Sequence, residues 1–523
     1  MQEYWNTKLR KIPRSAYRIA LYTLAFMLAM HAANFFWLAY SHDSLDFIAS
    51  YSERNWQISI GRYVQPVYWS IRGKIAAPLI VGLMSYLWLV PAVCIAADMF
   101  QLKSEVSRCL LSGIMTGSVA LIATNATYIY LLDVFLFALL LNVLAAWTSV
   151  KAKGKWRFLT PVLVALSLGL YQAYLQVYVV AVMIWAVLEI LDFGDGYLYQ
   201  TMGSCLISAA YLVAGVALYY GTLMLVLKVT GIELSNNYNG LTGVMNYGGY
   251  DLVILLKETW MRPFEYLMKG IGKDSGLVAI ARCVLLAIGV VSTLYMVIKK
   301  QFRTIAAGVI FLALALLPLG MNLIYFASKG MMHDLMIYSY CFADIGALAV
   351  SERAVDFAFK NKGTNGFGLK AVRVVACVVP IILSILIFDK AIYANQVYLK
   401  KKLEYDATQS MVVRVLDRLE QVDGYEAGET KVWFVGELND SPIVLDRSGF
   451  SDVYRLTGTW SSIAVTYYSR YWAYCENILG YRLSLYWDEP NAPLQEIAQE
   501  MPCFPKNGSI QMVDGIAIVK ISE

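Results

Sequence analysis

The chain has 523 residues, of which 59% are hydrophobic and only 15% charged, and its mean hydropathy is +0.54. A soluble domain carries roughly 25% charged residues. A larger core cannot explain the deficit, because surface-to-volume scaling limits the size of one core. The composition therefore excludes an ordinary soluble protein and predicts segments that face lipid. The net charge of +5 is small for this length and does not suggest nucleic-acid binding.

Eleven apolar runs indicate membrane-spanning helices, each of which needs about 20 mostly apolar residues. They lie near Ile19–Tyr40, Ile75–Ala97, Cys109–Tyr128, Leu131–Val150, Phe158–Leu170, Ala173–Leu191, Gly203–Val229, Leu277–Ile298, Thr304–Ala327, Leu335–Ser351 and Val372–Ile392. The run Phe158–Phe193 also fits one long kinked helix in place of a hairpin, which would change the parity of the count. The first run is too long for a cleavable signal peptide, so we expect it to be retained.

The orientation follows from the Lys and Arg residues in short loops, which concentrate on the cytoplasmic side. With eleven spans, four basic clusters fall on one side: Lys8 to Arg18, Lys151 to Arg157, Lys299 to Arg303, and Arg353 to Arg373. We therefore expect the N-terminus in the cytoplasm and the C-terminus outside.

Three outer segments are long, namely residues 41–74, residues 230–275 and the tail from residue 393. In the second, Leu252–Gly270 alternates apolar and charged residues, which is typical of an amphipathic helix at the membrane interface; an ordinary loop is the alternative.

The tail has the pattern of a small α/β domain. Gln396–Val422 predicts a helix and Lys431–Gly436 a strand, and Asp514-Gly515 between two apolar runs predicts a hairpin. We therefore divide the chain into a transmembrane domain, residues 1–392, and an extracytoplasmic α/β domain, residues 393–523.

The cysteines and the known glycine motifs indicate no metal or nucleotide. Six of the eight cysteines lie in apolar runs, and Cys475 with Cys503 leaves a disulfide open if the tail is outside the cytoplasm. No His/Cys cluster suggests zinc, and no phosphate-binding glycine loop is present. We expect no metal and no cofactor.

The first outer loop, residues 41–74, carries acids and bases together. Asp43 and Asp46 follow the first span, and Arg54 and Arg62 come later in the loop. A partly buried carboxylate can act as a general base, and an Arg can clamp a phosphate with two hydrogen bonds. The loop therefore favours chemistry on a lipid phosphate, although both acids also fit a simple helix end.

Further ionisable or polar residues fall near the same predicted face, and ionisable groups inside a membrane suggest function by default. Tyr171-Gln172 lies at a helix end and suits either a sugar site or an aromatic belt. The other residues are Asp133, Lys228, Arg282, Lys329, His333, Asp334 and Asp344.

Four features together resemble the GtrII-like bacterial glucosyltransferase family of the multi-spanning GT-C class. They are His42-Asp43 with Asp46, Trp56 followed by Gly61-Arg62-Tyr63, the Tyr171-Gln172 pair after an apolar run, and a small soluble domain that begins with a helix and KVWFVGE. Members often carry two adjacent acids where this chain has His42-Asp43, which leaves both Asp43 and Asp46 as candidate bases.

The resemblance implies a GT-C-like fold in the bacterial plasma membrane. It implies transfer of a hexose, with inversion, from a polyprenyl-phosphate carrier to a cell-surface polysaccharide, and a functional link to a donor-making glycosyltransferase and a flippase. It implies that Asp43 or Asp46 is the base. Carrier-phosphate ligands would be Arg62, Arg54, Lys329 and His333, and sugar or acceptor ligands would be Trp56, Tyr171, Gln172 and Asp133.

Three other functions stay open at this point. A flippase for lipid-linked sugars would favour internal repeats and broken helices, and Asp344 and Arg282 are compatible with it. A polysaccharide polymerase or ligase would favour more basic residues in residues 230–275, which are balanced in charge. A receptor or structural role is the third option, and the acids and bases clustered in one short loop count against it.

Overall fold

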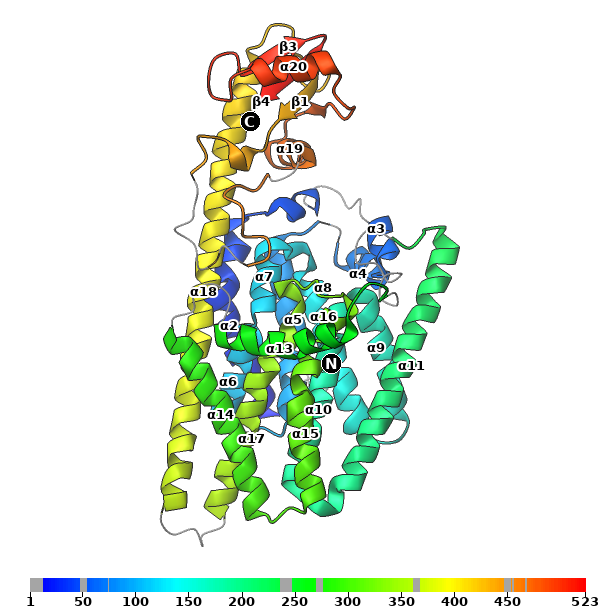
Figure 1. Ribbon diagram of the computed structural model, residues 1–523, viewed down its shortest axis with the longest axis vertical. Helices are drawn as coiled ribbons and strands as arrows, with labels where there is room; N and C mark the ends of the chain where they lie inside the picture. Colours follow the sequence, from blue (N-terminus) through cyan, green and yellow to red (C-terminus); the bar gives the residue numbers. More distant parts are fainter. Residues whose placement is uncertain are drawn as a thin grey trace, which may run out of the picture.

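The computed structural model describes residues 13–47, 54–73, 75–235, 247–269, 276–360, 367–445, 453, 456–465 and 468–523. Long helices stand side by side in a bundle, and the last of them carries a small α/β part away from one end of it (Figure 1). The arrangement is that of a polytopic helical membrane protein.

Each expected apolar run overlaps a helix of the bundle. The helices are α2 (Arg14–Trp37), α5 (Pro78–Met99), α6 (Glu105–Thr116), α7 (Val119–Thr127), α8 (Ile129–Val150), α9 (Leu159–Leu170), α10 (Leu175–Phe193), α11 (Leu198–Thr230), α14 (Gly276–Lys299), α15 (Thr304–Met321), α17 (Cys341–Lys360) and α18 (Phe367–Glu420). Within the described ranges, eight helices are long and apolar enough to cross a membrane, or nine if α6 and α7 form one span. The count of eleven stays a prediction, because α9 has only 12 residues and α17 carries several charges.

The run Phe158–Phe193 folds as a hairpin and not as one kinked helix. Helix α9 ends at Leu170, and the chain turns before α10 begins at Leu175. Lys151, just before α9, forms an ion pair of 3.5 Å with Glu189 near the end of α10. The hairpin therefore returns to the end of the bundle from which it started.

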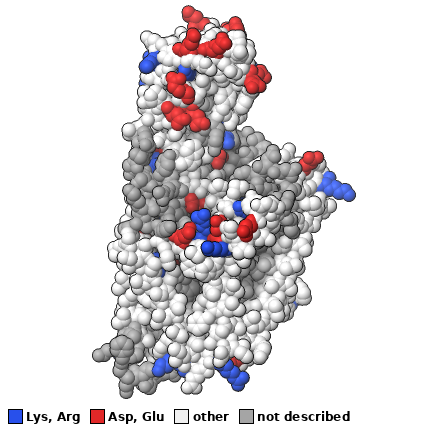
Figure 2. All heavy atoms as spheres, viewed as in Figure 1, with Lys and Arg blue, Asp and Glu red and all other residues white. Residues whose placement is uncertain are grey.

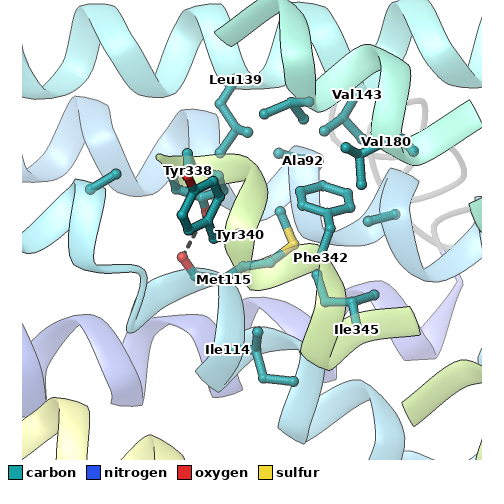
Figure 3. Close-up of a cluster of buried hydrophobic side chains, with 14 of the residues drawn as sticks. Ala92, Ile114, Met115, Leu139, Val143, Val180, Tyr338, Tyr340, Phe342 and Ile345 are labelled. Atoms are coloured by element: carbon teal, nitrogen blue, oxygen red, sulfur yellow. Dashed lines mark hydrogen bonds between the residues drawn. The ribbon is translucent and has the colours of Figure 1, made fainter. Parts of the chain in front are cut away.

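The span Cys109–Tyr128 is broken, with a bend of 40° between α6 and α7. A bend frees carbonyl groups that lipid cannot satisfy, so side chains must do so. Tyr338 Oη donates to Met115 O at 2.7 Å, in a core that also holds Phe342 (Figure 3). His31 Nε2 donates to Thr116 O at 3.0 Å.

The amphipathic helix expected in the second outer segment is α13 (Leu252–Lys269). It lies across the upper ends of α14 and α15 (Figure 1). Charged side chains gather at its place, above a largely uncharged belt (Figure 2). This position fits an amphipathic helix at one interface of a membrane.

Short elements cover the same end of the bundle. They are η1 (His42–Phe47), α3 (Arg54–Ser59), α4 (Val64–Arg72), α16 (Leu323–Ala327), η5 (Asp334–Met336) and η6 (Tyr338–Tyr340).

Beyond the bundle, α18 leads into a four-stranded sheet with the order β2-β1-β4-β3. The strands are β1 (Lys431–Val435), β2 (Ser484–Leu485), β3 (Ile510–Val513) and β4 (Ile516–Lys520), and the helices beside them are α19 (Tyr468–Tyr474) and α20 (Ala492–Glu500). The strand at Lys431 and the hairpin at Asp514-Gly515 form where the sequence predicts them. All eight cysteines, including Cys475 and Cys503, are free thiols.

Candidate active site

Asp43 lies in η1, directly after α2, and contacts two basic side chains. His42 Nε2 is 3.3 Å from its Oδ2, and Arg470 Nη2 of α19 is 3.6 Å from its Oδ1. The Asp43 side chain is 27% exposed, so a substrate hydroxyl can reach it. The other candidate base, Asp46, belongs to the same turn, but its side chain is outside the described residues.

The surroundings of Asp43 keep it ionised. Burial is the largest influence and would by itself raise the pKa of the carboxyl group. The hydrogen bond and charge of His42, the charge of Arg470 and a hydrogen bond from Tyr128 together outweigh burial and lower the pKa below its ordinary value. At neutral pH the group is therefore a carboxylate, which is the form a general base requires.

The turn that carries Asp43 is fixed between the bundle and the C-terminal part. Ser41 Oγ and Ser44 Oγ both donate to the carbonyl of Thr127, at the end of α7. Leu45 is fully buried in the core of the C-terminal part, and Asn477 Nδ2 donates to its carbonyl at 2.9 Å. The C-terminal part thus helps to place the candidate base.

A second carboxylate, Asp334 of η5, lies against the same end of α7. Its Oδ2 accepts hydrogen bonds from Thr457 N at 2.8 Å and Thr457 Oγ1 at 2.9 Å. Thr457 O in turn accepts from Thr127 Oγ1 at 2.9 Å. Burial raises the pKa of Asp334, although the bonds from Thr457 and the charge of His333 oppose it. The predicted phosphate ligand His333 is half-buried beside it.

Lys329 lies above two aromatic rings of the second outer segment. It adopts a left-handed backbone conformation with φ of 56°. Its Nζ is 5.8 Å from the ring of Tyr247 and 5.5 Å from that of Tyr250, which is cation–π geometry. Arg54 and Trp56, on the short helix α3, are both exposed.

Arg62, Tyr171 and Gln172 come together at the tip of the α9–α10 hairpin. The Arg62 guanidinium lies 5.1 Å above the Tyr171 ring, and its Nε is 3.5 Å from Gln172 Oε1. Gln172 Nε2 also donates to Ile60 O at 3.0 Å. These contacts hold the first outer loop on the hairpin. Among the described residues, neither Arg62 nor Lys329 forms a hydrogen bond or ion pair with Asp43.

Asp133 is completely buried at the start of α8. It pairs with Arg72 at 2.9 Å and accepts a hydrogen bond from Tyr68 at 3.0 Å. The pair joins α4 to α8 and gives Asp133 a clear structural task, so its contact with a sugar stays a prediction. Trp88 Nε1 completes the network by donating to Tyr68 Oη at 2.9 Å.

Sequence reasoning missed one contributor to this site, Arg470, and the partner of another, Asp334. Arg470 lies more than 400 positions from Asp43, and nothing in its local sequence distinguishes it from a surface residue. Asp334 was visible as an acid at the outer face, but its link to α7 depends on Thr457, a residue of an irregular segment. The sequence therefore pointed to Asp334 and not to Arg470.

The family comparison covers this arrangement from α2 to α17. The family model described as Glucosyl transferase GtrII matches residues 17–350. The chain belongs to the GtrII glucosyltransferase family. It is therefore a membrane glycosyltransferase, which favours transfer chemistry over the flippase and receptor alternatives.

The match to the GtrII family ends before α18, so the sheet, α19 and Arg470 are outside it. No curated protein and no solved structure matches the chain. The placement of Asp43 against Arg470 is thus a feature of this GtrII protein that comes from its structure and not from the family comparison.

Proposed function

We propose that this GtrII-family protein transfers a hexose from a polyprenyl-phosphate carrier to a cell-surface polysaccharide at the outer face of the plasma membrane. Asp43 is the general base. The observation that supports this assignment most strongly is the partly exposed, ionised Asp43 carboxylate at the outer end of α2, held between His42 and Arg470.

The proposed reaction uses that carboxylate. Asp43 takes the proton of an acceptor hydroxyl, and the hydroxyl oxygen attacks the anomeric carbon of the donor sugar. The bond from this carbon to the phosphate oxygen breaks, and polyprenyl phosphate leaves with the electron pair. Attack from the face opposite the phosphate inverts the anomeric configuration. Cations near the phosphate stabilise the charge that develops on it.

The test is a transfer assay with purified protein in detergent. Wild type, Asp43→Asn and Asp46→Asn are incubated with radiolabelled polyprenyl-phosphate glucose and surface polysaccharide, and label in the polymer is counted. Loss of a general base lowers rates by about 10²–10⁴-fold, and we expect this loss in Asp43→Asn. Asp417→Asn, an exposed acid on α18, is the matched control.

Two results would contradict the proposal. An Asp43→Asn protein that transfers label at the wild-type rate would remove Asp43 as the base, and a dead Asp46→Asn protein would then identify the neighbouring acid. A folded wild-type protein that moves no label from any common polyprenyl-phosphate hexose would contradict the donor class.

A further inference from the structure

A small polar cavity of about 50 Å³ lies inside the bundle at the bend between α6 and α7. Gly113 and Gly117 line it on one side, and helices α13, α14, α17 and α18 close the others. Its polar lining consists mainly of Tyr266, Arg282, Asp344 and Lys390. None of these four side chains has a part in the mechanism described above.

Several polar atoms in this cavity lack hydrogen-bond partners within the described structure. They are Arg282 Nε, Asp344 Oδ1 and the hydroxyl of Tyr266, and each is buried. Arg282 is only 6% exposed, and its Nε lies 3.8 Å from Asp344 Oδ1. This ion pair is too long for a hydrogen bond, and buried polar atoms are nearly always hydrogen-bonded, so a polar ligand fits between Arg282, Asp344 and the Tyr266 hydroxyl.

The charges of the cavity favour an anion. Arg282 and Lys390 face it with two positive charges, and Asp344 supplies one negative charge. Lys390 also pairs at 3.1 Å with Asp389, whose side chain is partly exposed. The start of α7, at Ser118 and Val119, lines the same cavity and adds the positive end of a helix dipole.

An apolar groove of about 180 Å³ adjoins this cavity, and Leu267 of α13 lines both. Residues of α13, α14 and α15 line the groove. Pro263, Phe264, Leu286 and Val290 are among its lining residues, and Thr293 is the single polar residue that the described lining contains. Helix α14 packs mainly on α17 and α18, whereas α15 packs on α10 and α13, which leaves the space between them.

A cationic cavity joined to an apolar groove at the membrane interface fits an anionic headgroup on a long hydrocarbon chain. We propose that Arg282 and Lys390 bind the phosphate of the polyprenyl carrier, with its first isoprenoid units in the groove lined by α13, α14 and α15. This inference rests on the proposed function. It assigns the phosphate to residues other than Arg62, Arg54, Lys329 and His333.

The position of Tyr266 connects this phosphate site to the outer acids. Its ring packs at 5.1 Å from that of Tyr340, six residues after Asp334, and Arg282 Nη1 donates to the carbonyl of Leu267, the residue after Tyr266, at 3.5 Å. Asp334 in turn reaches the end of α7 through Thr457. One set of contacts around α7 therefore joins the phosphate site to the elements that hold Asp43.

The experiment measures direct binding of radiolabelled polyprenyl phosphate, without a sugar, to the full-length protein in detergent. We expect Arg282→Gln and Lys390→Gln each to raise the Kd by about tenfold, since a charge-assisted hydrogen bond contributes about 1.5 kcal/mol or more. Arg262→Gln, an exposed arginine of α13 paired with Glu265, is the matched control and should bind as wild type does.

A second pair of variants tests the groove. Val290→Trp fills it, whereas Val291→Trp places the same ring on another face of α14. We expect only the former to weaken binding of polyprenyl phosphate. Binding of inorganic phosphate should be weak in wild type and unchanged by Val290→Trp, and equal affinity for inorganic and lipid phosphate would overturn the assignment to a lipid.

Folding is checked by thermal unfolding of each variant. Arg282→Lys retains the charge, so it should bind between wild type and Arg282→Gln, and it replaces the Gln variant if that one fails to fold. Unchanged Kd values in Arg282→Gln and Lys390→Gln overturn the inference, as does a wild type that binds no polyprenyl phosphate. If the variants lose binding but wild type transfers no sugar, the proposed function fails and the inference stands.

Discussion

At the scale of single residues, Asp43 depends on a permanent charge that comes from the far end of the chain. The Arg470 guanidinium lies 3.6 Å from Asp43 Oδ1, and its charge lowers the pKa of the carboxyl group. Without Arg470, the effect of burial on Asp43 is opposed mainly by His42 and Tyr128, so the pKa of the carboxyl group rises. The change in Asp43 titration should appear in the pH dependence of the reaction.

We predict that Arg470→Gln moves the acid limb of the kcat/KM profile to higher pH. At neutral pH the loss should be no more than about fivefold, because a partly exposed ion pair contributes about 1 kcal/mol or less. The measurement is kcat/KM from pH 4 to 9, with the exposed Arg418→Gln as control. A profile that coincides with wild type would show that Arg470 does not tune Asp43.

The lowered pKa of Asp43 also contributes to folding. The pKa of Asp43 is lower in the folded protein than in the unfolded chain. Its contribution to stability is therefore complete at a pH above the pKa of the unfolded chain, and it is lost as the pH falls through the pKa of the folded protein.

The buried Arg72–Asp133 pair gives a second prediction. Asp133→Ala leaves the Arg72 guanidinium buried without a counter-charge, which typically costs about 3–5 kcal/mol. We expect a loss of that size in the free energy of unfolding in mixed micelles. The double variant Arg72→Met with Asp133→Leu should recover much of it, because it removes both charges. A single variant as stable as wild type would mean that water reaches the site.

Residue types in the sequence were a partial guide to these sites. The pattern placed Asp43 and Tyr171-Gln172 near the outer face because they lie at the ends of apolar runs, and Arg62 because it lies in the loop between the first two runs. It could not show that Arg62 stacks on Tyr171, or that Arg470 contacts Asp43. Such contacts join residues far apart in the chain, and no local periodicity encodes them.

At the scale of elements, α18 joins the bundle to the C-terminal part through buried charges. Lys400 and Lys401 both pair with Glu404, and all three are nearly fully buried. The two ammonium groups also donate to the carbonyls of Gly458, Thr459 and Ser461. This contact fixes the segment that contains Thr457 against the helix.

We predict that Glu404→Gln loosens residues 456–465 from α18. Removing the shared carboxylate leaves two buried ammonium groups without a counter-charge, at a cost of about 3 kcal/mol or more. That cost raises the population of the open segment by roughly a hundredfold. Limited proteolysis of the segment measures the change, and Asp406→Asn, in an exposed pair with Lys402, is the control. Equal rates of proteolytic cleavage in Glu404→Gln and Asp406→Asn would contradict the prediction.

Element prediction succeeded where hydrophobicity alone decides the structure. The amphipathic α13 and the strands around Asp514-Gly515 follow from their residue patterns. The break between α6 and α7 did not, because it depends on His31 and Tyr338, which lie in other helices and satisfy the freed carbonyls. A hydropathy profile predicts one continuous span for a broken pair of helices such as α6 and α7.

At the scale of the whole molecule, a chain of contacts gathers the basic clusters at one end of the bundle. Arg18 pairs with Glu105, Lys103 with Asp356, and Arg353 with Asp192. Lys300 donates to the carbonyl of Asp192 at 3.1 Å, and Lys151 pairs with the nearby Glu189. Positive side chains lie at the lower end and acidic ones on the opposite, C-terminal part (Figure 2). The distribution favours a cytoplasmic lower end.

The orientation is tested by labelling with a membrane-impermeant maleimide. In a background without reactive native cysteines, Asn507→Cys places a thiol on the C-terminal part and Lys153→Cys places one at the basic end. We expect Asn507→Cys to be labelled in intact cells, and Lys153→Cys only after the plasma membrane is permeabilised. The reverse pattern would place the basic end outside, against the positive-inside rule. Labelling of both thiols from outside would put Asp43 and the basic clusters on one face, so that the chain could not separate an outer catalytic end from a cytoplasmic one.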